Sequence, residues 1–206
     1  MGRFCGERAE TAEGFFARLQ GALPPSAASE PIPPGLRSAG VLVPLRCGAG
    51  GVNVVLARRT ERVPHHKGQV CFPGGSREAA DRDLLATALR EAKEELGIRP
   101  EDVSLLGAME PVPTVTGFCI QPFVARIPAD ARFLLDEFEM SEVFEAPLSI
   151  FTDFSRYRTA ETTFLGIPYK VYFLDYGPHV IWGATARILH RLAELALRMP
   201  PRGAAI

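Results

Sequence analysis

The hydrophobic positions of the chain form short β-branched runs in its first part and helical repeats elsewhere. The runs AGVLVPLRC and VNVVLAR are separated by the glycine turn GAGG, which predicts a hairpin or a pair of adjacent strands beginning near Ser38. A third run, QVCF, predicts a strand that leads into a Pro-Gly-Gly turn. The same pattern predicts five later strands, at residues 103–106, 122–127, 143–147, 162–165 and 170–174.

Apolar residues at helical spacing predict three helices. Residues 81–96 carry an apolar stripe that ends at Gly97, the position of a left-handed C-cap. Residues 181–199 repeat this spacing until prolines stop it, and residues 9–23 precede the proline-rich stretch PPSAASEPIPPG. Strands interleaved with helices predict an α/β fold, a sandwich in which helices cover both faces of a mixed β-sheet.

The pattern also predicts the domain organisation. We expect a helical arm and Pro-rich linker at residues 1–37 and one folded domain at 38–200, without internal repeats. A chain of 206 residues with 47% hydrophobic content is long enough for one buried core. The apolar face of the arm, which includes Phe15, Phe16 and Leu19, is compatible with a homodimer.

Charge and composition restrict the class of partner. The 23 basic and 24 acidic residues provide no global positive field for nucleic acid or an anionic membrane, so a polyanionic ligand must be met locally. No secretion signal and no apolar run near ~20 residues is present, which predicts a cytoplasmic protein. The four separated cysteines predict free thiols in a reducing compartment, and they are Cys5, Cys47, Cys71 and Cys119.

The candidate chemistry lies in the helix predicted at 81–96. Glu91, Glu94 and Glu95 fall within two turns, and spacings of three and four residues share one helix face, so we expect their carboxylates to converge. Hard carboxylate oxygens without nearby His or Cys favour Mg²⁺ or Mn²⁺, which commonly share their coordination with substrate phosphates. The alternative is that EAKEE forms an ordinary solvated helix face. The glycine turn before the helix favours a ligand site, because it lets backbone approach a ligand closely.

The segment at residues 74–98, GGSREAADRDLLATALREAKEELGI, resembles the Nudix hydrolase box G-x5-E-x7-R-E-U-x-E-E-x-G-U, in which U is aliphatic. Its second half matches at Arg90, Glu91, Glu94, Glu95, Gly97 and Ile98. The first half departs from the box, because Arg82 stands where the first Glu belongs, and Asp81 or Glu78 are the candidate substitutes.

This resemblance implies a pyrophosphohydrolase that acts on a nucleoside diphosphate linked to another moiety, with Mg²⁺ or Mn²⁺ and two or more ions. It implies that Glu91, Glu94 and Glu95 hold the metal and that Arg90 orients the cluster, with Glu95, Glu94 and Arg90 as the catalytic residues. Glu95 is the first choice for the general base. Three acidic residues outside the box are alternative bases: Glu139, Glu142 and Glu145.

Immediately before the box, LARRTERVPHHKGQVCFPGG at residues 56–75 resembles the extra motif of coenzyme A pyrophosphatases, L-L-T-x-R-S-x3-R-x3-G-x3-F-P-G-G. The residues expected to bind substrate are Arg59, His66, Lys67, Gly68, Phe72, Gly74 and Gly75. Pro64 replaces the second Arg of the motif, which removes one cationic anchor. The remaining basic side chains still form a local cationic patch, which suits a pyrophosphate and a separate 3′-phosphate.

The C-terminal segment HVIWGATARIL also looks like the end of coenzyme A-type Nudix proteins. The implied reaction converts coenzyme A or an acyl derivative to 3′,5′-ADP and (acyl-)4′-phosphopantetheine. Alternatives are a Nudix enzyme for ADP-ribose or a dinucleoside polyphosphate, and a catalytically silent binding module. A turn at Thr114, Thr116, Gly117 and Phe118 is a further candidate border of the substrate cleft.

Overall fold

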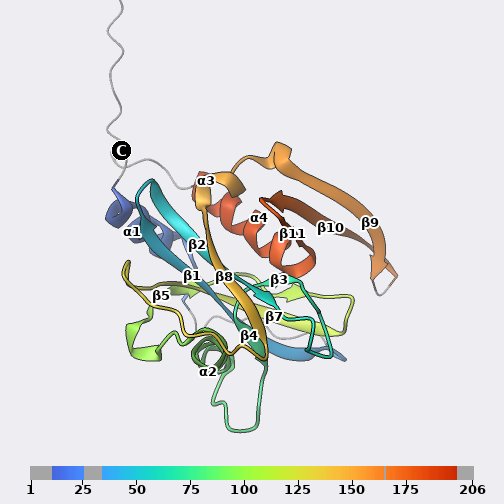
Figure 1. Ribbon diagram of the computed structural model, residues 1–206. Coiled ribbons are helices and arrows are strands. Elements are labelled where there is room, and N and C mark those ends of the chain that lie inside the picture. The colour runs from blue at the N-terminus through green and yellow to red at the C-terminus, as the bar shows by residue number, and fades with distance from the viewer. Residues whose placement is uncertain (1–10, 26–33, 165, 199–206) are drawn as a thin grey trace, which may run out of the picture.

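The computed structural model describes residues 11–25, 34–164 and 166–198, which form two sheets and their covering helices (Figure 1). The helices are α1 (Ala12–Ala22), α2 (Leu84–Leu96), α3 (Leu148–Phe151), α4 (Gly183–Arg198) and the 3₁₀ turns η2 (Pro100–Asp102) and η3 (Phe154–Arg156). The strands are β1 (Arg37–Gly48), β2 (Gly51–Arg59), β3 (Val70–Cys71), β4 (Gly74–Ser76), β5 (Ser104–Ala108), β6 (Val112–Pro113), β7 (Phe118–Arg126), β8 (Met140–Pro147), β9 (Tyr157–Phe164), β10 (Ile167–Tyr176) and β11 (His179–Trp182).

The larger sheet is mixed, as the sequence predicts. Its strand order is β3-β2-β1-β7-β5, with β4 on β1, β6 on β7 and β8 on β2. Among the strands of the described residues, only β1 and β7 of this sheet run parallel, while its remaining pairs are antiparallel. The long strand β1 changes partners along one edge, pairing with β4 at Ala39–Val41 and with β2 from Leu45 onward. This exchange brings the turn at Gly74 against the middle of the sheet.

Helices cover both faces of this sheet, with α1 and α4 on one side and α2 on the other (Figure 1). The apolar residues of β2 contribute to the hydrophobic cores on both faces of the sheet. Val54 and Leu56 pack in the core with α1 and α4, whereas Val55 and Ala57 pack in the core with α2. All four side chains are buried, because alternate strand residues face opposite sides and both sides are covered. The predicted α/β sandwich is therefore confirmed.

Three predicted helices begin later than expected, and the first of them, α1, begins at Ala12 with Thr11 as its N-cap and not at residue 9. Helix α2 begins at Leu84 and not at residue 81, because Asp83 is the N-cap and accepts a hydrogen bond from the Ala86 amide at 2.7 Å. The last helix begins at Gly183, since Ile181 and its neighbours form β11 and pair with β10. Residue 199, its predicted end, lies outside the described residues. The predicted strands are present with shifted limits, and β11 completes a separate three-stranded sheet in the order β11-β10-β9 that the pattern did not predict.

Helix α1 packs within the chain. Phe16 and Leu19 lie in the same core as α4, and Glu13 accepts a hydrogen bond from Arg126 Nη1 of β7 at 2.7 Å. The apolar face that suggested a dimer is therefore largely covered by this chain's own sheet. The domain limit between residues 37 and 38 stays a prediction.

Among the described residues, no helix is both long enough and apolar enough to cross a membrane. Cys47, Cys71 and Cys119 are free thiols, and Cys5 lies outside the described residues.

Candidate active site

The turn between β3 and α2 places two glycines against the glutamates of α2. The Gly74 amide donates to Glu95 Oε2 at 2.9 Å. A Cβ on Gly74 would lie 2.5 Å from the Gly40 carbonyl oxygen, and a Cβ on Gly75 would lie 2.3 Å from Glu91 Oε1. A side chain is therefore excluded at Gly74 by the backbone of β1, and a side chain at Gly75 would displace the Glu91 carboxylate. The sequence predicted that this turn lets backbone approach a ligand, and the structure shows its backbone against β1 and the α2 carboxylates.

Gly40 is a structural requirement that sequence reasoning missed. A Cβ on Gly40 would lie 2.2 Å from the Leu84 carbonyl oxygen, so strand β1 and the start of α2 are in direct backbone contact there. This contact sets the distance between α2 and the sheet, and hence the position of the α2 carboxylates relative to the turn. The only signal in the sequence is a glycine inside a β-branched run.

Glu95 is a buried carboxylate with both oxygens engaged. Its side chain is 3% exposed, and Oε1 accepts a hydrogen bond from Arg59 Nη1 at 3.0 Å. Burial raises the pKa of Glu95 to about 8, a rise that the Gly74 amide and Arg59 oppose and that Glu91 and Glu139 increase. A divalent cation at this position would act in the opposite direction and favour the ionised carboxylate.

Arg59 connects α2 to the segment before β8. Its Nη2 donates to Glu139 Oε2 at 3.0 Å, so one guanidinium bridges Glu95 and Glu139. The two contacts span 36 and 80 residues of sequence. Arg59, which the sequence analysis expected to bind substrate, thus pairs with two carboxylates. Of the three acidic residues outside the box, Glu139 is the one linked to an α2 glutamate, through Arg59.

Arg90 is the centre of a second ionic cluster. It forms ion pairs with Glu91 at 3.0 Å, with Glu94 at 2.9 Å and with Asp81 at 3.2 Å. Asp81 is buried and also accepts hydrogen bonds from the Thr87 hydroxyl and the Glu78 amide, both at 2.9 Å. Its hydrogen bond from Arg90 is the main cause that lowers the pKa of Asp81 to about 2.

The structure therefore distinguishes the two substitutes for the missing first Glu of the box. The Glu78 side chain is 65% exposed and lies 3.8 Å from Arg90, whereas Asp81 is buried in contact with it.

The comparisons with known proteins agree with this geometry. The NUDIX domain family matches residues 36–145, which is more than half of the chain. A protein of Pectobacterium atrosepticum, described as an uncharacterized Nudix hydrolase NudL, is 40% identical over 87% of this chain and 91% of its own. The protein of the same description from Enterobacter sp. (strain 638) is 41% identical over 80% and 85%. The chain belongs to the Nudix hydrolase family.

A solved structure shows the same fold for this Nudix hydrolase. The Nudix hydrolase RenU of M. smegmatis aligns over 81% of this chain and 89% of its own, with a TM-score of 0.55 and 19% sequence identity. The resemblance to the family stated from residues 74–98 is thus confirmed, and the enzyme is a Nudix pyrophosphohydrolase.

The expected convergence of the three glutamates is only partial in this Nudix hydrolase. Glu95 is 3% exposed and Glu91 17%, but Glu94 is 57% exposed beside Arg90. Adjacent helix residues point about 100° apart, so Glu94 and Glu95 cannot share one direction. In the part of the chain that the structure describes, no three Asp, Glu, His or Cys side chains form a group that could hold a metal as they stand.

The donor chemistry nevertheless fits a hard divalent cation. Glu91 and Glu95 are both withdrawn from water, so burial raises the pKa of each, and Glu91 raises the pKa of Glu95 further. Arg90 and Arg59 now balance these like charges. A cation bound by these carboxylate oxygens would also neutralise them.

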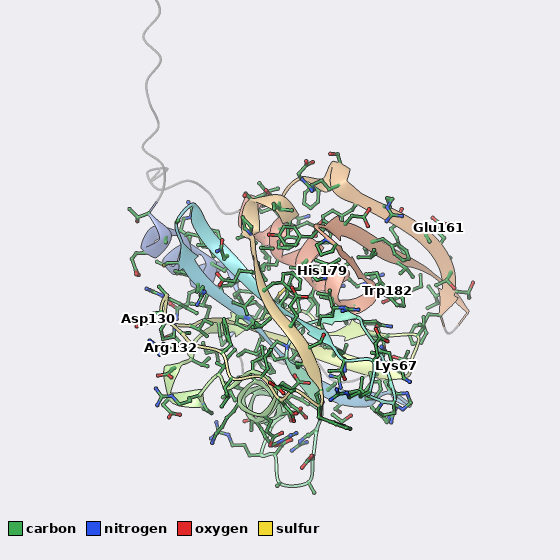
Figure 2. All side chains as sticks on the ribbon, viewed as in Figure 1. Lys67, Asp130, Arg132, Glu161, His179 and Trp182 are labelled. Atoms are coloured by element: carbon green, nitrogen blue, oxygen red, sulfur yellow. The ribbon has the colours of Figure 1, made fainter. Side chains whose placement is uncertain are left out.

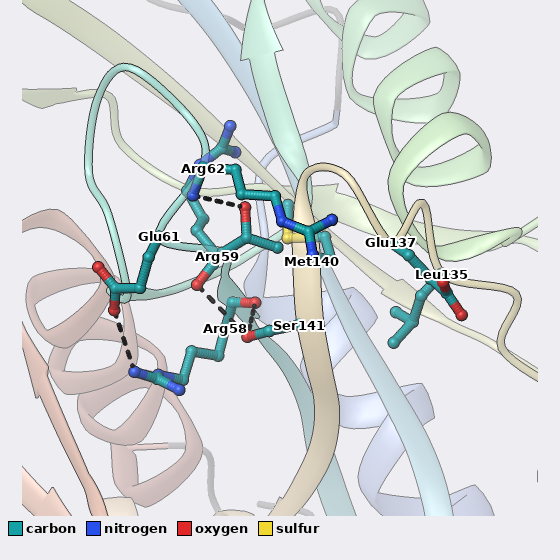
Figure 3. Close-up of a pocket in the computed structure, with 9 residues that line it drawn as sticks. Arg58, Arg59, Glu61, Arg62, Leu135, Glu137, Met140 and Ser141 are labelled. Carbon is teal, nitrogen blue, oxygen red and sulfur yellow. Dashed lines mark hydrogen bonds and ion pairs between the residues drawn. The ribbon is translucent and has the colours of Figure 1, made fainter.

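Two open clefts border the loop before β3. The first has a volume of about 390 Å³ and includes Arg59, Arg62 and Glu137 in its lining (Figure 3). The second has a volume of about 620 Å³ and includes Lys67 and Gly68. Neither is lined by the α2 glutamates, but Arg59 joins the first cleft to Glu95.

Four other residues expected to bind substrate differ in placement. Lys67 and Gly68 border the second cleft, as a substrate contact requires. His66 instead contacts Gln69 within its own loop at 3.0 Å, with a left-handed φ of 57° that few non-glycine residues adopt. Phe72 is 4% exposed and packs in the hydrophobic core, so it anchors the turn at Gly74 and does not face a ligand.

The remaining candidates lie away from the α2 glutamates, although Glu142 lines the second cleft. Glu145 accepts hydrogen bonds from Arg46 and Asn53, and Glu142 lies 3.4 Å from His179 of β11. The turn from Thr114 to Phe118 is closed by its own hydrogen bonds and is not part of either cleft lining. Contacts within the protein therefore fix the positions of these side chains.

Replacing Arg90 with Met is expected to lower the free energy of unfolding by about 2–4 kcal/mol, because buried Asp81 would lose its countercharge. The melting temperature should fall by roughly 5–10 °C. Asp81→Asn keeps the hydrogen bonds from Thr87 and Glu78 and should cost less than half as much. Arg99→Met, at an exposed arginine paired only with near neighbours, is the control, and equal melting temperatures for the Arg90 and Arg99 variants would contradict the role of the cluster.

Proposed function

We propose that this Nudix enzyme hydrolyses the pyrophosphate bond of coenzyme A or a coenzyme A derivative, releasing 3′,5′-ADP and (acyl-)4′-phosphopantetheine. The support for this substrate is the motif at residues 56–75 together with its position. Arg59 near its start and Gly74 near its end both donate hydrogen bonds to the buried box carboxylate Glu95. The segment that resembles a coenzyme A motif is thereby in contact with the proposed catalytic group.

The α2 carboxylates have the proposed role of holding Mg²⁺ or Mn²⁺, through Glu91 and Glu95 with Glu94 from the exposed side. The bound ion would polarise the phosphoanhydride and lower the pKa of a water molecule. Arg90 positions this group by its simultaneous contacts to Glu91, Glu94 and Asp81. Glu95 remains our choice for the general base, with Glu139 as the alternative because Arg59 holds both.

The cationic residues before β3 suit a substrate with phosphates in two places. Arg62 lines the first cleft and Lys67 the second, while Arg58 lines both. Coenzyme A carries a pyrophosphate and, on the ribose, a separate 3′-phosphate. Local positive charge in a chain with net charge −1 supports recognition of such a polyanion at this surface.

Liquid chromatography of the products formed from coenzyme A, with Mg²⁺ present, tests the proposal. We expect 3′,5′-ADP and 4′-phosphopantetheine in equal amounts. Dephospho-coenzyme A, which lacks the 3′-phosphate, should have a KM about tenfold higher because one charge-assisted contact is lost. Faster turnover of ADP-ribose or a diadenosine polyphosphate at equal concentration would contradict the coenzyme A assignment and identify another nucleoside diphosphate derivative as the substrate.

A further inference from the structure

The second cleft lies between the loop before β3 and strand β11, and its walls are firmly joined. The buried Thr185 hydroxyl, at the start of α4, donates to the Val70 carbonyl of β3 at 3.1 Å. The His179 ring of β11 stacks on Phe144 of β8, with ring centroids 4.4 Å apart and an interplanar angle of 9°. Tyr176 also donates from β10 to the Glu145 carbonyl at 3.0 Å. The cleft is thus held open by the fold of both sheets.

Several polar groups that line this cleft already have partners. His179 Nε2 lies 3.4 Å from Glu142 Oε1. Arg58 Nε donates to the Gly68 carbonyl at 3.1 Å, and the same guanidinium contacts Glu61 at 3.3 Å. These contacts hold the Arg58 and His179 side chains in the wall of the cleft.

Two lining residues lack such partners. Trp182 is 40% exposed, although its ring lies parallel to Phe173 at a centroid distance of 6.0 Å. Lys67 is exposed and makes no hydrogen bond or ion pair with the described part of the chain. Figure 2 shows Lys67 on the loop before β3, and Trp182 and His179 on β11. The Trp182 ring and the Lys67 ammonium group are therefore available to contact a ligand in this cleft.

We propose that this cleft binds the nucleoside phosphate half of the substrate, with the base stacked on Trp182 and a ribose phosphate beside Lys67. This inference rests on the proposed function for the identity of the nucleotide. An exposed indole offers a π-face on which a purine can stack, and an unpaired ammonium attracts a phosphate. A cleft of about 620 Å³ is within the ordinary size of ligand sites.

The position relative to the catalytic groups agrees with this proposal. Arg58 lines both clefts, and the next residue, Arg59, lines the first and donates to Glu95. Successive strand residues point to opposite faces, so Arg58 and Arg59 extend from β2 toward opposite sides of the sheet. A substrate with its pyrophosphate near Glu95 would reach the second cleft around the end of β2.

Trp182 is the only tryptophan of the chain, so tryptophan fluorescence, excited selectively over that of tyrosine, reports on this cleft alone. We expect 3′,5′-ADP, titrated into the metal-free protein, to quench it in a saturable manner. Lys67→Ala should raise the Kd about tenfold, whereas Lys170→Ala, an exposed lysine on β10 outside the cleft, should leave it unchanged. 4′-Phosphopantetheine, which has no base, should not quench. Absence of quenching by 3′,5′-ADP, or equal effects of the two lysine variants, would overturn the proposal.

Kinetics separate this inference from the proposed function. Trp182→Leu should raise the KM for coenzyme A by roughly five- to a hundredfold and change kcat little, because stacking contributes to binding and not to bond cleavage. Hydrolysis of coenzyme A with an unchanged KM in this variant would refute the cleft assignment and leave the proposed function intact. Saturable quenching by 3′,5′-ADP without any coenzyme A turnover would refute the substrate and leave the nucleotide cleft.

Discussion

Glu95→Gln is expected to lower kcat about a thousandfold while the protein remains folded. The amide oxygen of Gln can still accept the hydrogen bond from Gly74. It carries no negative charge for a cation, cannot take a proton from water, and loses its ion pair with Arg59. Product chromatography with coenzyme A gives kcat, and thermal unfolding of the same preparation shows whether the fold is retained.

Glu101→Gln is the matched control for this experiment. Glu101 lies in η2, shortly after α2, and is 66% exposed, so the same chemical change there should leave kcat unaltered. Glu94→Gln should be less damaging than Glu95→Gln, because the Glu94 side chain is 57% exposed. Full activity of Glu95→Gln would remove this residue from the proposed catalytic group.

Excess EDTA is expected to abolish hydrolysis, and Mg²⁺ or Mn²⁺ added back should restore it. The proposed ligands are hard carboxylate oxygens, and Glu91 and Glu95, which are 17% and 3% exposed, favour positive charge beside them. A second measurement is independent of turnover: the melting temperature of the wild-type protein should rise as Mg²⁺ is added, because an ion that binds only the folded state stabilises it.

The double variant Glu91→Gln, Glu95→Gln is the control for metal binding. Its melting temperature should no longer respond to Mg²⁺, since both withdrawn carboxylates would be neutral. Unaltered hydrolysis in excess chelator would exclude the proposed metal chemistry, whatever the thermal data show.

Local periodicity in the sequence determined the layers of this fold and the helix that carries the chemistry. The β-branched runs formed β1 and β2, and the stripe from Leu84 to Leu96 formed α2, because strand and helix patterns depend on residues a few positions apart. The ion pair between Arg90 and Glu94 was predictable for the same reason, since four residues span about one helical turn. The glycines before α2 likewise indicated a close approach of backbone.

Only the tertiary structure decided which distant groups meet these local elements. The contact from Arg59 to Glu139 depends on the pairing of β2 with β8, and the choice of Asp81 over Glu78 depends on the path of the loop before α2. The separate sheet that carries Trp182 could not be inferred from a short apolar run, because such a run is equally compatible with the start of a helix. Local spacing identifies the face of an element, whereas strand register and loop path, which depend on packing of the whole chain, determine what lies opposite that face.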